Sequence, residues 1–170
     1  NTKYKSVDGV LYSKDMKTLL AYPAGKTNAS YTIPDGVTLI NSYAFYDCTS
    51  LKEVTIPNSV TEIGNSAFSG RTSLTSVMIP ASVTEISNYA FDDCTSLTAI
   101  NVDENNTKYK SVDGVLYSKD MKTLLIYPAG KTNTSYTIPD GVSEIRGDVF
   151  EYCTSLTKVT IPDSVTKIDR

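Results

Sequence analysis

The sequence predicts a repeat solenoid, mainly of β structure with short helical or 3-10 turns, built from 23-residue units with inserted β-hairpins. An Ile-Pro dipeptide recurs every 23 residues, apart from one longer interval of 59 residues. Columns of Val, Ile and Phe repeat at the same period and contain all four phenylalanines. A unit this short cannot bury its apolar face alone, so neighbouring units must stack. The dipeptides begin at Ile33, Ile56, Ile79, Ile138 and Ile161, and the phenylalanines are Phe45, Phe68, Phe91 and Phe150.

A longer unit opens the chain and returns after the third short unit. Residues 1–37 and 106–142 are identical at all but two positions, at an offset of 105 residues. In the second copy the β-prone runs Val115–Tyr117 and Thr123–Tyr127 flank a polar link, a pattern that favours a β-hairpin. The first copy predicts the same hairpin over Val10–Tyr22. The two differences are Ala21 against Ile126 and Ala29 against Thr134.

Each short unit is expected to contain one short strand. In the second of these units, Leu51, Val54 and Ile56 are the apolar positions of an extended segment. Pro57 then ends the strand, because proline has no N–H for a strand ladder. The later Val, Ile and Phe columns face the same axis. Stacking therefore places parallel strands about 4.8 Å apart and forms ladders of Phe on Phe and Ile on Ile.

The units predict one domain over residues 1–170. It is interpreted as a fragment, or an engineered excerpt, of a longer array, because neither end carries the polar capping repeat typical of solenoids. The predicted order is a partial long unit with a hairpin (1–32), three 23-residue repeats (33–101), a second long unit with a hairpin (102–137), and one full and one partial repeat (138–170).

Composition argues against several classes of function. The net charge of −3 provides no basic field for nucleic acid. Apolar runs such as Leu124–Tyr127 are far shorter than the roughly 20 residues of a membrane span, so no membrane insertion is expected. Histidine, the commonest general base and neutral metal ligand, is absent. We therefore expect no enzyme, no catalytic residue and no cofactor.

The three cysteines share one repeat column, and they are predicted to be packing residues. A nucleophilic thiol needs a base, and the chain has no histidine to supply one. Cys48 and Cys94 lie two repeats apart, about 10 Å at strand spacing, which is beyond the reach of a disulfide. Arg71 occupies the column between them, and Cys153 lies farther along. Small apolar residues in a buried stack are the expected outcome.

The repeat pattern resembles the BspA-like leucine-rich repeat. The pattern is Ile-Pro-x-x-Val-x-x-Ile-x-x-x-Ala-Phe-x-x-Cys-Thr-Ser-Leu-x-x-Val, and the segment Tyr109–Asp120 is similar to one that often interrupts such arrays. The resemblance implies a leucine-rich-repeat solenoid of a bacterial cell-surface or secreted protein. Members of the family include adhesins for host matrix or plasma proteins, such as fibronectin and fibrinogen. The resemblance therefore implies a role in adhesion, and it implies no catalytic residues. Arg71 in the Cys column and Val149 in the Ala column depart from the pattern, which bears on packing.

Acidic side chains give no metal site. Asp92-Asp93 and Asp103-Glu104 form two clusters, and neither has the ligand spacing of a calcium loop. Glu62 and Glu85 stack in one column about 5 Å apart, as like residues do in adjacent turns of any repeat. A carbohydrate-binding module or glycan-active enzyme is therefore the least favoured hypothesis.

The outward face of the predicted strands is the candidate binding surface, because alternate residues of a strand point to opposite faces. We expect a protein partner, with host extracellular-matrix and plasma proteins as the candidates, and adhesion as the function. The alternative is a passive spacer of a cell-wall protein. Uncapped ends also predict end-to-end self-association. The candidate partner-binding residues are Glu53, Thr55, Ser76, Met78, Ala99, Asn101, Lys158 and Thr160.

Overall fold

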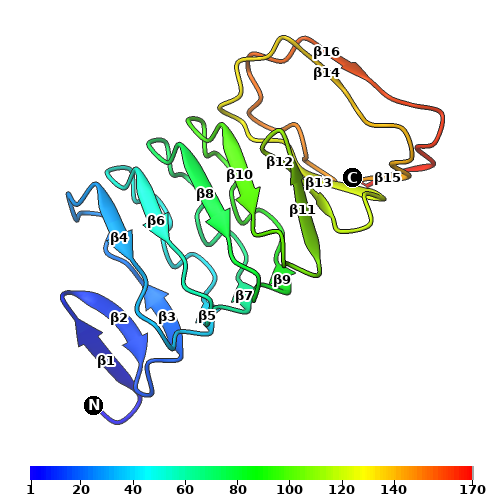
Figure 1. Ribbon diagram of the computed structural model, residues 1–170. Helices are drawn as coiled ribbons and strands as arrows, with labels where there is room; N and C mark the ends of the chain where they lie inside the picture. The colour runs from blue at the N-terminus through cyan, green and yellow to red at the C-terminus, as the bar shows by residue number, and fades with distance from the viewer. Residues whose placement is uncertain (170) are drawn as a thin grey trace.

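The chain winds into a β-solenoid of seventeen short strands in the computed structural model, which describes residues 1–169 (Figure 1). The predicted fold class is confirmed. Two rows of parallel strands run along the solenoid, and two antiparallel inserts interrupt it. The division of the chain into units stays a prediction.

The first row holds strands of three or four residues. Four of them follow a Thr-Ser-Leu segment, and the other two, over residues 30–32 and 135–137, follow the inserts of the long units. Partners in parallel pairs are 23 residues apart, as Tyr31 opposite Val54 illustrates. The pairs are β4 with β6, β8 with β10, and β14 with β16. The strands are β4 (Ser30–Thr32), β6 (Glu53–Thr55), β8 (Ser76–Ile79), β10 (Ala99–Val102), β14 (Ser135–Thr137) and β16 (Lys158–Thr160).

The second row consists of two-residue strands that carry the Ile column. Ile40, Ile63 and Ile86 lie directly opposite one another and are buried, so the predicted Ile ladder is present. The strands are β5 (Leu39–Ile40), β7 (Glu62–Ile63), β9 (Glu85–Ile86), β15 (Glu144–Ile145) and β17 (Lys167–Ile168).

Each insert is a three-stranded antiparallel meander, one strand more than the predicted hairpin. In the second insert, a tight turn at Asp113-Gly114 joins the additional strand to the strand that follows it. The positive φ values of these two residues, 51° and 77°, are those of the turn that joins twisted antiparallel strands. The third strand of each insert then joins the second row in parallel. The strands are β1 (Tyr4–Val7), β2 (Val10–Ser13) and β3 (Thr18–Ala21), and β11 (Tyr109–Val112), β12 (Val115–Ser118) and β13 (Thr123–Ile126).

The arcs that follow the second row contain no helix within residues 1–169, so the expected helical turns are corrected. The first arc closes with single turns, such as Ala44 N–H to Asn41 O at 3.1 Å. Tyr43 and Asp47 have φ values of 59° and 55°, and a left-handed residue cannot continue a right-handed helix. The same two columns are left-handed in all four arcs, which span residues 41–48, 64–71, 87–94 and 146–153.

The core is divided by the second insert. Strand β12 takes part in both halves, because Leu116 packs with the preceding turns whereas Val115 and Tyr117 pack with the following ones. The Phe ladder divides at the same place. It runs without a break to Phe91, with neighbouring ring centroids 5.1 and 5.2 Å apart, but Phe150 packs on Tyr127 instead. The predicted Phe ladder is therefore interrupted, because the insert separates its members.

Candidate binding surfaces

The outward strand face brings together six of the eight predicted partner-binding residues. They lie on β6, β8 and β10, and Met78 stands directly opposite Asn101. Met78 is 54% exposed, the largest apolar contribution of this face. Lys158 and Thr160 lie on β16, beyond the second insert and apart from the others (Figure 1). The six are Glu53, Thr55, Ser76, Met78, Ala99 and Asn101.

Ala99 is the weakest member of this face, because the second insert covers it. Its Cβ would lie 2.8 Å from a Cβ placed on Gly114, and Ile100 N–H donates to Gly114 O at 2.9 Å. Ala99 is therefore half-buried. The insert limits the sheet face on this side and leaves β6 and β8 as its most open part.

A second exposed surface, which we name the acidic arc, lies on the outer side of the first, third and fourth arcs. Its tyrosines are between 42% and 58% exposed. Tyr43 and Tyr46 form an edge-to-face pair with centroids 5.8 Å apart. Sequence reasoning missed this surface because it followed the strands. The acidic arc consists of Tyr43, Tyr46, Asp47, Tyr89, Asp92, Asp93, Asp148, Glu151 and Tyr152.

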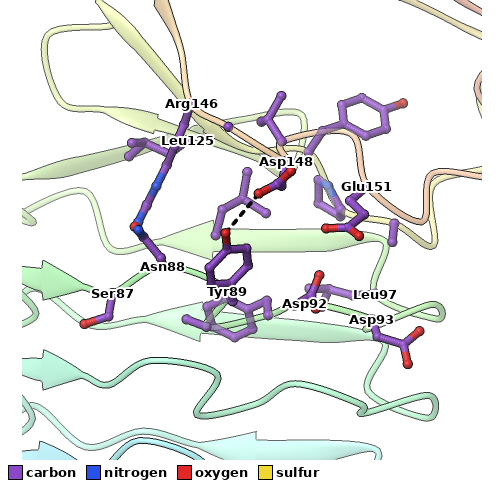
Figure 2. A pocket seen from close by; sticks show the side chains of 18 of the residues that line it. Ser87, Asn88, Tyr89, Asp92, Asp93, Leu97, Leu125, Arg146, Asp148 and Glu151 are labelled. Carbon is purple, nitrogen blue, oxygen red and sulfur yellow. Dashed lines mark hydrogen bonds between the residues drawn. The ribbon is translucent and has the colours of Figure 1, made fainter. Parts of the chain in front are cut away.

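A cleft of about 400 Å³ opens in the acidic arc where the second insert interrupts the solenoid (Figure 2). One wall is the arc 87–94, and the other is formed by residues 125–129 and the start of the arc 146–153. Tyr89 spans the opening, because its hydroxyl donates to the Asp148 carboxylate at 3.1 Å. Leu97 contributes to the apolar lining. This volume lies within the range of ligand pockets.

The charges of the cleft are unbalanced. Burial raises the pKa of Asp92, and the neighbouring charges of Asp93 and Asp148 raise it further. Burial also raises the pKa of Glu151, with Asp92 and Asp148 adding to the effect. Within residues 1–169 the salt bridges involve Lys167, with Glu144 and Asp169, and none neutralises these cleft carboxylates. The cleft therefore carries a negative potential.

The cysteines are buried free thiols, as predicted. Burial raises the pKa of Cys48 and Cys153 to about 11 and that of Cys94 to about 12. The Cys94 thiol donates to Phe68 O at 3.1 Å. A thiol that stays protonated is a poor nucleophile, so these residues act in packing.

Other candidate chemistry is sparse in the described chain. Glu62 and Glu85 are aligned on β7 and β9 as expected. Residues 1–169 contain no group of three or more His, Cys, Asp or Glu side chains arranged to hold a metal ion. The same residues include no helix with the length and apolar character to cross a membrane.

Comparison with known sequences identifies the repeat. Six copies of the family described as BspA type leucine rich repeat region match residues 24–126 and 129–170. The chain belongs to this family. The family is a repeat scaffold of bacterial surface proteins without catalytic residues of its own. No curated protein sequence matches the chain.

Solved structures of leucine-rich repeat proteins share this fold. A leucine rich cell surface protein from Faecalibacterium prausnitzii is 39% identical, with a TM-score of 0.74, over 82% of this chain and 37% of that one. The pneumococcal vaccine antigen PcpA is 31% identical, with a TM-score of 0.78, over 82% and 35%. A protein from Eubacterium ventriosum is 25% identical, with a TM-score of 0.61, over 99% and 60%. The chain spans less than two thirds of each.

Both departures from the BspA-type pattern are packing features. Arg71 is fully buried within the stack of arcs, and Val149 is 7% exposed. The signal for the acidic arc was present in the sequence as Tyr and Asp in the variable positions on either side of the Phe column. Because the residues at these positions differ between repeats, the periodicity that identifies the core residues does not identify them.

Proposed function

We propose that this chain is a non-enzymatic binding module of a bacterial cell-surface protein, and that it binds a protein partner in adhesion to host or microbial surfaces. The exposed tyrosines of the acidic arc carry the proposal. Tyrosine is a frequent anchor of protein interfaces, since its ring buries apolar area while its hydroxyl forms a hydrogen bond. The names of the similar surface proteins support the location.

The outward strand face is a second proposed contact surface. Solenoids offer such extended faces to partners. Here the six residues of the face are small and polar apart from Met78 and Ala99, with the negative charge of Glu53, and Lys158 adds a positive charge on the separate strand β16. It is suited to a polar contact that accompanies a tyrosine anchor.

The test is binding of the purified chain to immobilised fibronectin, fibrinogen, collagen and mucin. A variant of the acidic arc combines Tyr43→Ser, Tyr46→Ser and Tyr89→Ser. Serine fits these columns, because Ser66 and Ser69 occupy them in the second arc. We expect saturable binding to one panel protein that weakens at least about tenfold in this variant.

The matched variant changes the sheet face by Glu53→Ala, Met78→Ala and Lys158→Ala. A loss of binding in this variant alone assigns the site to the strands. Equal binding by the parent and both variants contradicts both proposed surfaces. Circular dichroism of each variant shows that the fold is retained.

A passive spacer is the second candidate function, and the duplication of the long unit favours it. Adding nearly identical blocks extends a solenoid without adding a new contact surface. Two results together would support the spacer. The chain would bind no protein of the panel, and the whole protein would lose adhesion when it is shortened by one block.

A further inference from the structure

The arcs are joined by a ladder of backbone hydrogen bonds. Phe45 N–H donates to Ala67 O at 2.8 Å, and one turn later Phe68 N–H donates to Ala90 O at the same distance. The left-handed columns on either side contribute further donors, such as Gly70 N–H to Asp92 O at 3.0 Å. Each arc thus offers three alternate amides to the carbonyl groups of the next.

The third arc has no successor in this ladder. The corresponding amides belong to Tyr89, Phe91 and Asp93, and within residues 1–169 none of them donates to a backbone carbonyl group. The Asp93 amide faces the carboxylate of Asp92. All three residues line the cleft. They form an open backbone edge inside the solenoid, like the one that Asp148, Phe150 and Tyr152 offer on the fourth arc, and buried N–H groups without a partner favour binding of a group that can accept their hydrogen bonds.

The insert leaves this edge open because it is attached elsewhere. Gly130 N–H donates to Leu97 O at 2.8 Å, which fixes the insert to the strand side of the preceding turn. Tyr127 N–H donates to Val149 O, so the segment 125–129 joins the ladder of the following arc. The cleft is the resulting gap between the two ladders.

Carboxylates surround the open edge on both sides. Asp92 and Asp93 lie on the third arc, and Asp148 and Glu151 lie across the cleft (Figure 2). Arg146 is the one basic side chain among the lining residues. An exposed tyrosine next to carboxylates favours binding of a cationic side chain. Such a side chain is attracted by the face of the aromatic ring as well as by the negative charges.

We propose that this cleft receives a segment of a partner protein that carries lysine or arginine. The carbonyl groups of the segment accept hydrogen bonds from the amides of Tyr89, Phe91 and Asp93, and its basic side chain lies between Asp92 and the Asp148–Glu151 pair. The inference rests on the proposed function, for which it supplies the chemistry of the partner.

The experiment titrates the full chain with the peptide acetyl-Thr-Lys-Val-Lys-Thr-amide while amide resonances are recorded. We expect saturable shifts and slowed hydrogen exchange at the amides of Tyr89, Phe91 and Asp93. The amides of Phe45 and Phe68, already bonded within the ladder, serve as internal references. A peptide with glutamate in place of both lysines is expected not to bind.

Variants separate a specific cleft from general attraction between charges. Asp148→Asn with Glu151→Gln removes two cleft charges, and asparagine suits the left-handed position of Asp148 (φ 58°). Asp8→Asn with Glu62→Gln removes two charges outside the cleft and outside both proposed binding surfaces, including the left-handed Asp8 (φ 49°). We expect the cleft variant to weaken binding about tenfold and the control variant to bind like the parent.

Equal weakening by both variants, or no saturable binding of the lysine peptide up to about 1 mM, overturns the inference. Panel-protein binding that the lysine peptide does not compete with, and that the cleft variant leaves unchanged, also overturns it while the proposed function stands. Peptide binding at the cleft without binding of any panel protein counts against adhesion to those proteins and supports the cleft.

Discussion

Arg71 is the one charged side chain buried among residues 1–169, at 0% exposure. Its Nη2 donates to Leu51 O at 3.0 Å, whereas Nε and Nη1 have no partner. The guanidinium lies 5.6 and 5.7 Å from the ring centroids of Phe45 and Phe68. Burial lowers the pKa of Arg71. The rings offset only part of the cost of removing this charge from water.

Arg71→Met is expected to stabilise the protein by about 1–3 kcal/mol, because it keeps most of the side-chain volume and removes a buried charge with unpaired donors. Urea unfolding measures the change. Arg71→Ala is the comparison and is expected to destabilise, because it leaves a cavity. A lower unfolding free energy for Arg71→Met would show that the contacts of the guanidinium outweigh its desolvation.

Two pairs of tyrosine hydroxyls predict instability at high pH. The hydroxyl of Tyr12 in the first insert bonds that of Tyr31 on β4, and the hydroxyl of Tyr117 in the second insert bonds that of Tyr136 on β14. Burial raises the pKa of Tyr31 and Tyr136 above the ordinary value of 10.0, and the hydrogen bonds and charges of their partners add to this. The fold therefore favours the neutral phenols. Their contribution to stability is complete below pH 10 and is lost as the pH rises above it.

The measurement is an alkaline titration followed by tyrosinate absorbance and circular dichroism. We expect part of the tyrosinate signal to appear only together with unfolding. Tyr31→Phe with Tyr136→Phe is expected to reduce that late fraction. Complete ionisation of all tyrosines while the fold persists would contradict this prediction.

At the scale of the elements, the two inserts have nearly the same sequence, but the second packs against a preceding turn and the first does not. A Cβ on Gly130 would lie 2.4 Å from the backbone carbon of Ser96 and 2.7 Å from Leu97 N, whereas a Cβ on Gly25 would meet nothing within 4 Å. Only the second insert is docked on a preceding turn. Glycine is required at position 130 by close approach to backbone, which cannot move aside as a flexible side chain can.

Gly130→Ala is expected to destabilise the protein by about 1–3 kcal/mol, because the added methyl group forces the insert away from residues 96–97. Gly25→Ala is the matched variant and is expected to stay within about 0.5 kcal/mol of the parent. Thermal and urea unfolding compare the two. Equal effects of both substitutions would mean that the insert is not held by this contact.

The core positions followed from the sequence, because burial imposes the 23-residue period on Phe45, Phe68 and Phe91. The left-handed arcs did not, since Tyr43 and Tyr89 carry no local signal for positive φ, as glycine would. The cleft was equally inaccessible to sequence reasoning. Ile126–Ala129 nearly repeats Ala21–Ala24, and only the docking of a preceding turn on the second copy creates the gap. The repeat period marks the core positions within each unit, but it does not indicate how an insert docks on a neighbouring unit.

At the scale of the whole molecule, each end of the described solenoid exposes large apolar side chains. Leu11 is 39% exposed, whereas its counterpart Leu116 is fully buried against the preceding turns. Ile161 and Ile168 are 50% and 59% exposed at the other end. These surfaces are shaped for contact with another solenoid turn, which is the basis for the proposed end-to-end association.

Sedimentation velocity is expected to show association of the chain that increases with concentration. Leu11→Lys is expected to reduce it, because the charge is costly to bury against an apolar turn. Met78→Ala, which truncates an exposed apolar side chain on β8 in the middle of the solenoid, is the control and is expected to leave association unchanged. A purely monomeric profile at high concentration would contradict the proposal.

The near-identity of the two long units has a consequence for inheritance. Genetic recombination between their coding sequences would insert or delete one block of 105 residues in frame. Each junction in the product would already exist in this chain, so no new interface would have to evolve. One block contributes four layers, about 19 Å at strand spacing. A bacterial lineage can therefore lengthen or shorten such a solenoid in a single genetic event.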